Sequence, residues 1–489
     1  MLLGRWIAAV VIGVIPERQA LVCRRDHLVI GGGVDLKDAI EIFPHRNCGT
    51  RYPELPRFRL TVEVRPAPPR AARPLGRPAP SVRIPTVAVP AGRWRRIALV
   101  VLVLLIALAG FNYVRPVPAV EATSAGLSRY TITGTPPVLP WPTTGSAAVA
   151  ASQLGLIATS GDQQPAPSGS VAKVMTALVL LADKALAVGD EGPTLVITDQ
   201  DVATYKADAR DQQSVVPVTA GEQLSEYELL EALLVASANN IAETIARWDA
   251  GSVTAFVGKM NDRAASLHLT HTTFADPAGL SVQTVSTPAD LIALGMAAMK
   301  QGVLAQIVGE VQTILPVAGL VYNTNGSLGQ SGIIGIKTGV NEGATFLFAA
   351  NATVDGHPVT IYGCVMRQPT LAIAFDAAKA LTDTMASSLK MRAIVSRNDV
   401  VGAYDAPWGS HADVVANTDL AFVEWPGMVL RWRLDAKPVA VDVSSVPSGT
   451  PAGTLHLVLG DQQADVPLVT SGALDPPGLV WRLSRINWL

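Results

Sequence analysis

The chain is poor in cysteine, in aromatic residues and in net charge, and each shortage excludes a class of protein. Its 489 residues include only three cysteines, Cys23, Cys48 and Cys364, which are too few and too scattered for a disulfide framework or a CxxC-type zinc site. Aromatic residues make up 5% of the chain, which argues against platforms for stacking nucleic-acid bases. The 38 basic and 40 acidic residues leave a net charge of −2, so we expect no nucleic-acid partner.

Apolar residues, by contrast, are abundant. They make up 49% of the chain against 16% charged residues, which excludes disorder over most of the length. The length suggests about three domains. Residues 97–114, IALVVLVLLIALAGFNYV, carry no charge and as a helix would span about 27 Å, close to the thickness of a bilayer core. With Trp94 and Tyr113 at its ends, where interfacial rings are favoured, this run predicts one transmembrane helix over residues 95–114.

The arginines predict how that helix is oriented. Residues 65–96 hold eight arginines and no acidic residue, whereas only Arg115 lies just beyond the span. Lysine and arginine concentrate on the cytoplasmic side, so residues 1–92 are expected in the cytoplasm and the rest of the chain outside. A cleaved signal peptide is the less favoured alternative, because the apolar run is long and starts about 95 residues into the chain.

The segment 1–92 is expected to be largely disordered. Residues 66–90 are rich in proline, arginine and alanine, a composition that builds no core and favours an extended chain. For residues 1–64 three readings stay open: a small folded piece, a second membrane-associated segment, or upstream sequence that is not native to the protein.

Beyond a linker expected over residues 115–145, hydrophobic periodicity predicts a unit with both helices and strands over residues 146–392. One helix is expected over 170–186. A second is expected to open at Ser225, whose capping box pairs it with Glu228, to be interrupted at 237–240 and to resume through Ala250. Two more are expected from Thr287, with Pro288 in the first turn, and over about 370–389. Strands are expected over 147–159, 332–339, 344–351 and 358–366, the last three forming an antiparallel sheet. From residue 398 to 489 only short strands separated by turns are expected, which indicates a separate small β-domain.

Three short motifs of chemically useful residues occur in order within the mixed unit. They are Ser170-Val171-Ala172-Lys173, Ser237-Ala238-Asn239 and Lys337-Thr338-Gly339. A serine hydroxyl needs a base, and a lysine one helical turn later lies on the same face within its reach. Lysine serves as a base only when burial and nearby cations lower its pKa, and Lys337 would supply such a cation.

The other motif residues suit substrate binding. Ser237 and Asn239 fall in a break between helices, where a serine can relay a proton and an amide can hold a substrate carbonyl. Lys337 and Thr338 at the end of a strand suit an anionic group such as a carboxylate. Gly339 would let a peptide lie close along that strand edge.

Together these motifs resemble those of the serine D-alanyl-D-alanine carboxypeptidases, the low-molecular-weight penicillin-binding proteins of peptidase family S11. The resemblance extends over SVAKVMTALV, SANNIAETIARW, TTFADPAGL, STPADLIALG and NTN before GIIGIKTG, about residues 145–392. It implies an α+β catalytic domain of the β-lactamase and penicillin-binding-protein type, with an antiparallel sheet and a helical lobe, followed by a small all-β domain. It also implies a bacterial cell membrane protein whose catalytic domain faces the cell wall.

The resemblance also implies a role for each motif residue. Ser170 would be the acylated nucleophile, Lys173 its general base and Ser237 a proton relay. Asn239 would bind the substrate amide, while Lys337, Thr338 and Gly339 would bind the terminal carboxylate end. The backbone N–H groups of Ser170 and Val340 would form the oxyanion hole. No metal or cofactor is implied; the partners would be peptidoglycan stem peptides ending in D-Ala-D-Ala and, as covalent inhibitors, β-lactams.

Departures from the family pattern leave the substrate less certain than the reaction class. Val340-Asn341 stands where a bulky polar or aromatic residue and a hydroxyl are commoner, and Arg367 is the nearest substitute for a missing basic residue. Two rival functions remain open. A β-lactamase is disfavoured because the only glutamate between Glu243 and Glu342 is Glu310; a membrane-bound penicillin-binding sensor is disfavoured because such a binder has no use for the relay serine.

Overall fold

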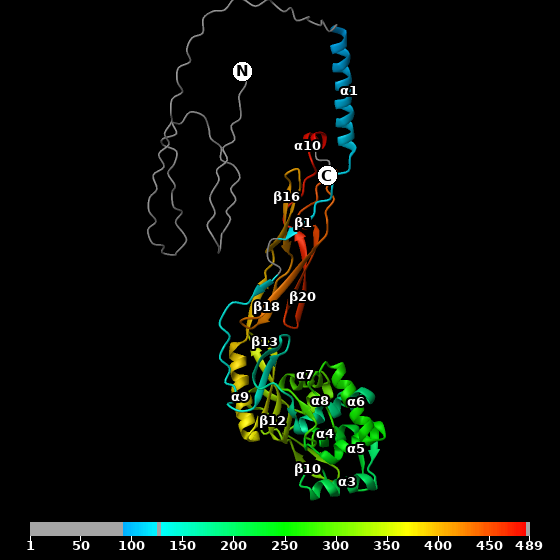
Figure 1. Ribbon diagram of the computed structural model, residues 1–489, viewed down its shortest axis with the longest axis vertical. Helices are drawn as coiled ribbons and strands as arrows, with labels where there is room; N and C mark the ends of the chain where they lie inside the picture. Colours follow the sequence, from blue (N-terminus) through cyan, green and yellow to red (C-terminus); the bar gives the residue numbers. More distant parts are fainter. Residues whose placement is uncertain (1–90, 125–128, 486–489) are drawn as a thin grey trace, which may run out of the picture. The chain divides into compact units, whose positions relative to one another are not determined.

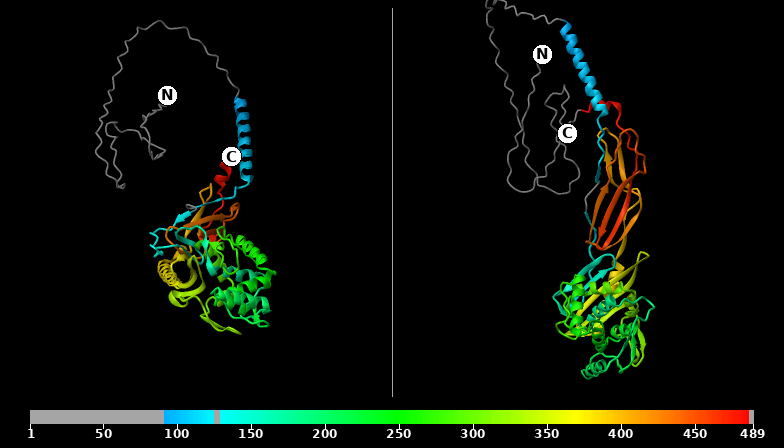
Figure 2. Two further views of the ribbon diagram at one scale, coloured as in Figure 1. Left: turned by 60° about the horizontal axis from the view of Figure 1, so that its bottom comes forward. Right: turned by 90° about the vertical axis from the view of Figure 1, so that its right-hand side faces the viewer.

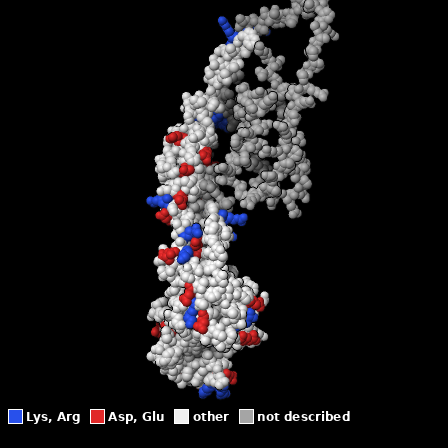
Figure 3. Space-filling model, turned by 90° about the vertical axis from the view of Figure 1, so that its left-hand side faces the viewer, with Lys and Arg blue, Asp and Glu red and all other residues white. Residues whose placement is uncertain are grey.

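The computed structural model describes residues 91–124 and 129–485. The predictions made for residues 1–92 therefore fall almost wholly outside the described residues. The described part begins with helix α1 (Ala91–Val114), of which Gly92–Val114 is long and apolar enough to cross a membrane. Its apolar side chains are exposed, as in Leu104 at 62%, and beyond the arginines at its beginning residues 97–114 carry no charge, so the face of the helix in Figure 3 is mostly uncharged below its upper end. A buried core helix of a soluble protein would not leave this surface uncovered.

A five-stranded antiparallel sheet forms the centre of the unit that contains both helices and strands (Figure 1). Its strand order is β11-β12-β13-β3-β4, so β11 is an edge strand. The strands are β3 (Ser146–Ala151), β4 (Gly155–Gly161), β11 (Ile333–Asn341), β12 (Gly343–Val354) and β13 (His357–Gln368). The single strand expected over 147–159 is thus a hairpin, because residues 152–154 form a turn that the apolar sequence disguises.

Successive residues of these strands face opposite sides of the sheet, and different helices cover the two sides. Phe346, Phe348 and Ala350 pack with α9 (Leu371–Ser388). Leu347 and Ala349 belong instead to the core that includes α2 (Lys173–Asp183) and α7 (Pro288–Met299). This alternation buries both faces of β12, which explains its nearly continuous run of apolar residues.

The helical lobe lies on the α2 side of the sheet (Figure 2). It comprises α2 and α7 with α3 (Asp199–Arg210), α4 (Glu226–Leu234), α5 (Asn239–Ala250), α6 (Val253–Ser266) and α8 (Gly302–Ile307). The expected helix signals are observed: the Ser225–Glu228 capping box opens α4, and Thr287 caps α7 ahead of Pro288. Two short hairpins, β6 (Thr194–Val196) with β7 (Gln223–Ser225) and β9 (Gln312–Leu315) with β10 (Gly319–Tyr322), and the pair β5 (Ala166–Pro167) with β8 (Val285–Ser286) complete the unit.

The C-terminal region forms a second, antiparallel β-structure with strand order β1-β15-β16-β20-β19-β18-β2. Its strands are β1 (Ala122–Ser124), β2 (Arg129–Thr131), β15 (Val400–Asp405), β16 (His411–Ala416), β18 (Val429–Ala436), β19 (Pro451–Leu459) and β20 (Gln462–Thr470), with β14 (Lys390–Val395) and β17 (Leu420–Glu424) forming a separate pair and α10 (Leu479–Ser484) at the end.

Two details of this region differ from the sequence-based expectation. The segment 115–145, expected to be a linker, supplies both edge strands of the seven-stranded sheet. Each of these strands has only three residues, too few to show a period-two pattern. Within 398–489, where short strands are expected, residues 439–446 form isolated bridges at Val439 and Val446 and no strand.

Candidate active site

Ser170 and Lys173 lie side by side at the beginning of helix α2. A 3-10 turn, Gly169–Ala172, carries Ser170 and leads directly into α2, whose first residue is Lys173. Lys173 Nζ lies 2.8 Å from Ser170 Oγ. The sequence-based expectation of one continuous helix from residue 170 differs only in this tighter first turn, and the spacing of three residues still brings the two groups together.

The Lys173 amine is enclosed by hydrogen-bond acceptors. It donates to Asn239 Oδ1 at 2.6 Å and to the backbone oxygen of Ala278 at 2.9 Å. Lys173 is 0% exposed, and this burial, with the positive charge of Lys337 as the second cause, lowers its pKa well below the ordinary value. Asp276 and Asp208 oppose that shift. The net effect is a lysine able to hold a neutral amine, which a general base requires.

The second motif lies at the junction of α4 and α5, as the break in the helical pattern predicts. Asn239 is the first residue of α5, and its Nδ2 donates to Gln213 Oε1 at 2.9 Å. Ser237 is 4% exposed and has a φ of +60°, a left-handed backbone conformation that is uncommon outside glycine. Such a conformation in a buried turn is held by the surrounding structure, and it occurs often at functional sites.

The third motif forms the end of edge strand β11. Lys337 Nζ donates to Thr324 Oγ1 at 3.3 Å and to the backbone oxygen of Thr338 at 3.2 Å. The hydroxyls of Thr324 and Thr338 are 2.7 Å apart. Burial lowers the pKa of Lys337 to about 7. An anionic ligand beside this ammonium group would favour its charged form, so the Lys337, Thr338 and Thr324 group suits a carboxylate.

Glycines allow β11 to lie directly against the backbone of the Ser170 turn. A Cβ on Gly339 would lie 2.5 Å from the backbone oxygen of Ser168 and 2.9 Å from the Ser170 nitrogen. A Cβ on Gly169 would lie 2.8 Å from the Val340 nitrogen. The interpretation that Gly339 leaves room for a substrate peptide is therefore incomplete, because the side of Gly339 on which a Cβ would project contacts the Ser170 turn. The two backbone N–H groups expected in the oxyanion hole flank this contact.

A loop that carries Ala278 completes the enclosure of Lys173. Asp276 shapes this loop: its carboxylate accepts hydrogen bonds from the backbone N–H groups of Ala278 (3.1 Å) and Leu280 (2.8 Å) and from the Thr284 hydroxyl (2.5 Å). Asp276 therefore organises the loop that contacts Lys173.

Three contacts of the site were missed by sequence reasoning: Gln213, Thr324 and the carbonyl of Ala278. Thr324 and Ala278 lie within the NTN and TTFADPAGL stretches of the resemblance, which give them no role of their own, whereas Gln213 carries no local signal. Arg367, considered as a substitute for the family's basic residue, donates to the backbone oxygen of Asp162 at 3.4 Å. Cys364 is fully buried, and burial raises the pKa of its thiol.

Comparison with known proteins shows the family. Residues 143–370 match the family described as D-alanyl-D-alanine carboxypeptidase. The chain is 33% identical over 222 residues to the D-alanyl-D-alanine carboxypeptidase DacB2 of Mycobacterium tuberculosis, covering 43% of this chain and 72% of that protein. This chain belongs to the D-alanyl-D-alanine carboxypeptidase family. It is a serine-type peptidase of cell-wall peptidoglycan, as the resemblance of its motifs implied.

Further relatives extend the comparison in both sequence and fold. A D-alanyl-D-alanine endopeptidase of Pseudomonas aeruginosa is 31% identical over 140 residues, covering 29% of this chain and 42% of that protein. The crystal structure of DacD from Francisella tularensis matches with a TM-score of 0.50 and 17% identity over 71% of this chain and 96% of that chain. Penicillin binding protein 5 from Haemophilus influenzae matches with a TM-score of 0.50 and 19% identity over 70% and 99%. These likenesses confirm the predicted fold class.

Proposed function

We propose that Ser170 is the nucleophile that this carboxypeptidase acylates and that Lys173 is its general base. The single observation that carries the proposal is the position of the Lys173 amine, which is buried, 2.8 Å from Ser170 Oγ and bonded to two carbonyl oxygens. A neutral amine has two hydrogens and one lone pair. With both hydrogens donated to Asn239 and Ala278, the lone pair is left for the Ser170 hydroxyl proton.

The reaction then proceeds in two balanced steps. Ser170 Oγ attacks the carbonyl carbon of the penultimate D-alanine while its proton passes to Lys173. The C–N bond breaks as the proton taken up by Lys173 passes through Ser237 to the leaving nitrogen, and free D-alanine departs, leaving an ester on Ser170. Water then attacks the ester, and one of its protons passes to Ser170 Oγ as the ester bond breaks, giving the shortened stem peptide and the free serine. The backbone N–H groups of Ser170 and Val340 stabilise the oxyanion in both steps.

Two parts of the site bind the substrate: the end of β11 and the beginning of α5. Lys337 and Thr338 bind the terminal carboxylate, and Thr324 supports them through its hydroxyl. Asn239 uses the second hydrogen of its Nδ2 to bind a substrate amide carbonyl, since the first is donated to Gln213. β-Lactams carry a carboxylate and a reactive carbonyl in a similar arrangement, so they acylate Ser170 and block it.

We also propose a single-pass membrane protein with its catalytic domain on the extracytoplasmic side. The support is the uncharged run 97–114 of helix α1, which follows arginines that include Arg93, Arg95 and Arg96 in the first turns of the helix and has only Arg115 directly after it. Residues 1–92 then form the cytoplasmic region, 95–114 the span, 146–392 the catalytic domain and 398–489 the β-domain, to which β1 and β2 are added. Protease added outside intact cells should remove the catalytic domain and spare the N-terminal region; the reverse result would refute this topology.

The test of the catalytic proposal uses the full chain in detergent. D-Alanine release from a peptide ending in D-Ala-D-Ala and labelling by a fluorescent penicillin are measured for wild type, Ser170→Ala and the exposed control Ser266→Ala. Both signals should vanish in Ser170→Ala and persist in the control. A Ser170→Ala protein that still labels would refute the nucleophile assignment. Penicillin labelling of the wild type without D-alanine release would favour the sensor alternative. A cross-linked peptide, used as a second substrate, tests for the endopeptidase activity named for some of the relatives.

A further inference from the structure

The loop between α3 and β7 is hydrogen-bonded to the start of α5. The Asn239 backbone N–H donates to the Ser214 oxygen at 2.8 Å, and Asn239 Nδ2 donates to Gln213 Oε1 at 2.9 Å. One residue further, Asn240 accepts from the Val216 N–H at 3.1 Å and donates to the Val216 oxygen at 2.9 Å. Four hydrogen bonds in a short stretch fix this loop relative to the Ser237–Asn239 motif.

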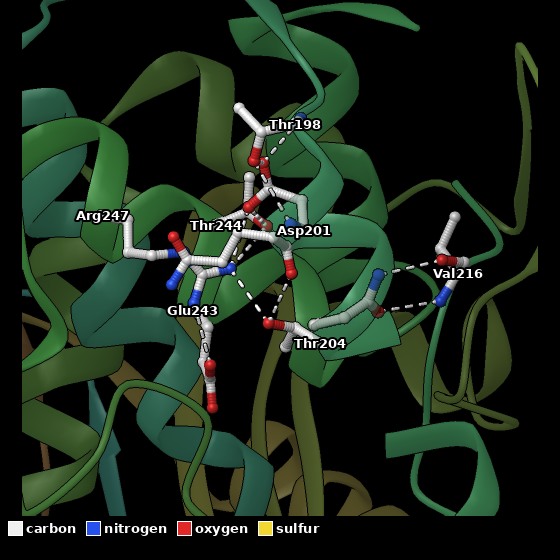
Figure 4. Close-up of polar contacts among 9 residues, drawn as sticks. Thr198, Asp201, Thr204, Val216, Glu243, Thr244 and Arg247 are labelled. Atoms are coloured by element: carbon white, nitrogen blue, oxygen red, sulfur yellow. Dashed lines mark hydrogen bonds and ion pairs between the residues drawn. The ribbon is translucent and has the colours of Figure 1, made fainter. Parts of the chain in front are cut away.

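The helix that precedes the loop is itself anchored to α5 (Figure 4). Asp201 of α3 forms an ion pair of 2.8 Å with Arg247 of α5 and accepts a hydrogen bond of 2.8 Å from Thr244. Arg247 also pairs with Glu243 at 3.0 Å. Asp201 is 5% exposed and the Arg247 side chain 18%, so this pair is largely shielded from water. The loop that carries Gln213 is therefore held at two places: at α3, from which it starts, and at the beginning of α5, to which it is hydrogen-bonded.

Which atom of the Asn239 side chain faces Lys173 matters for the chemistry. Lys173 has only hydrogens to offer to a partner other than Ser170, so the Asn239 amide must present its oxygen, as it does at 2.6 Å. If the amide turned over, two N–H donors would face each other and the lysine lone pair would lose its direction. An acceptor on the opposite side of the amide prevents this, and Gln213 Oε1 is that acceptor.

We propose that Gln213 is a positioning residue for the acylation reaction, which fixes the Asn239 amide so that its oxygen faces Lys173. The inference rests on the proposed roles of Ser170, Lys173 and Asn239. Gln213 is half-buried and its backbone N–H donates to the Asp208 oxygen at 3.0 Å, so the backbone of the loop stays in place when the side chain is changed. The Gln213 side chain is hydrogen-bonded to Asn239 and through it influences the base.

Two substitutions of Gln213 should shift the pKa of Lys173 in opposite directions. Gln213→Ala removes the acceptor, so the amide loses its fixed orientation and the charged form of Lys173 loses part of a hydrogen bond; its pKa should fall. Gln213→Glu keeps an acceptor and adds a negative charge, which favours protonated Lys173 and should raise its pKa. The other charged groups that act on Lys173 are Lys337 of β11, Asp276 of the Ala278 loop and Asp208 of α3, and both variants retain all three.

The experiment measures the rate constant of acylation by a fluorescent penicillin from pH 5 to 10 on the full chain. Gln213→Ala should be acylated about 10-fold more slowly, the loss expected for one hydrogen bond. The acid limb of its profile, the fall in rate at low pH as Lys173 is protonated, should move to lower pH. Gln213→Glu should keep the rate within about 3-fold, with the limb moved to higher pH. Ser214→Ala, which changes a side chain but keeps the backbone acceptor, is the matched control and should match wild type.

Two results would overturn the inference: a Gln213→Ala profile equal to that of wild type, or equal losses in both variants with an unmoved acid limb, as a purely structural role would give. Failure of the underlying proposal is recognised separately, because wild type would then not label or Ser170→Ala would label as wild type does.

Discussion

The contact between β11 and the Ser170 turn predicts that Gly339→Ala inactivates the enzyme without touching a side chain of the site. The added Cβ would lie 2.5 Å from the Ser168 oxygen and 2.9 Å from the Ser170 nitrogen, where ordinary contact begins near 3.4 Å. The obstacles are backbone atoms, which cannot turn aside as a flexible side chain does. The strand and the turn must therefore separate by about 0.9 Å, the difference between 3.4 and 2.5 Å.

That displacement acts on the two N–H groups proposed for the oxyanion hole. A misplacement near 1 Å costs roughly 100-fold in rate, and loss of one oxyanion donor costs about 100- to 1,000-fold in kcat. We therefore expect acylation and D-alanine release to fall by about 100-fold or more. The strain should cost about 1–3 kcal/mol of unfolding free energy, as for other overpacked sites, so most of the protein remains folded.

Penicillin acylation rate and thermal unfolding, measured side by side, check this expectation. Gly258→Ala is the matched control, since a Cβ there meets nothing within 4 Å and the residue lies inside α6. That variant should be fully active and slightly more stable, by about 0.5–1 kcal/mol, because alanine favours a helix. A Gly339→Ala protein with acylation within 3-fold of wild type would refute the reasoning about this contact.

Three further predictions follow from buried charges. Lys337→Gln removes a cation that lowers the Lys173 pKa, so that pKa should rise and the acid limb of penicillin acylation should move to higher pH; an unmoved limb would contradict the coupling. Glu226 is fully buried with neither carboxylate oxygen hydrogen-bonded, and burial raises its pKa to about 7. Its folded form holds the proton more tightly than its unfolded form, so stability should fall as pH rises from about 4.5 through 7, and Glu226→Gln should flatten that fall in a thermal-unfolding series; an unchanged slope would count against it. Arg247→Met leaves Asp201 buried and unpaired, and denaturant unfolding should show a loss of about 3–5 kcal/mol; adding Asp201→Asn should restore part of it, whereas a loss under 1 kcal/mol would show that the pair is not shielded.

Local signals in the sequence predicted much of the catalytic domain. The Ser225–Glu228 capping box and the Thr287-Pro288 start act over a few residues, and each helix begins where they indicate. The approach of Lys173 to Ser170 is equally local, because three residues of helix bring the two groups together.

The remaining contacts depend on residues far apart in the sequence. Gln213 lies 26 residues from Asn239, and Ala278 lies 105 residues from Lys173, so no periodicity links them. Gly339 must lack a Cβ because β11 lies directly against the Ser170 turn. That contact joins segments far apart in the chain, so it is not evident from the sequence. For the same reason the strands at 122–124 and 129–131 were missed, since only their pairing with distant strands defines them.

The most direct test of the account is to locate the covalent bond. The full chain is incubated with benzylpenicillin, digested, and its peptides are mapped by mass spectrometry. The account predicts one adduct, on the hydroxyl of Ser170, and none after Lys173→Ala at neutral pH. An adduct on any other residue, or acylation of Ser170 at the wild-type rate without Lys173, would contradict it.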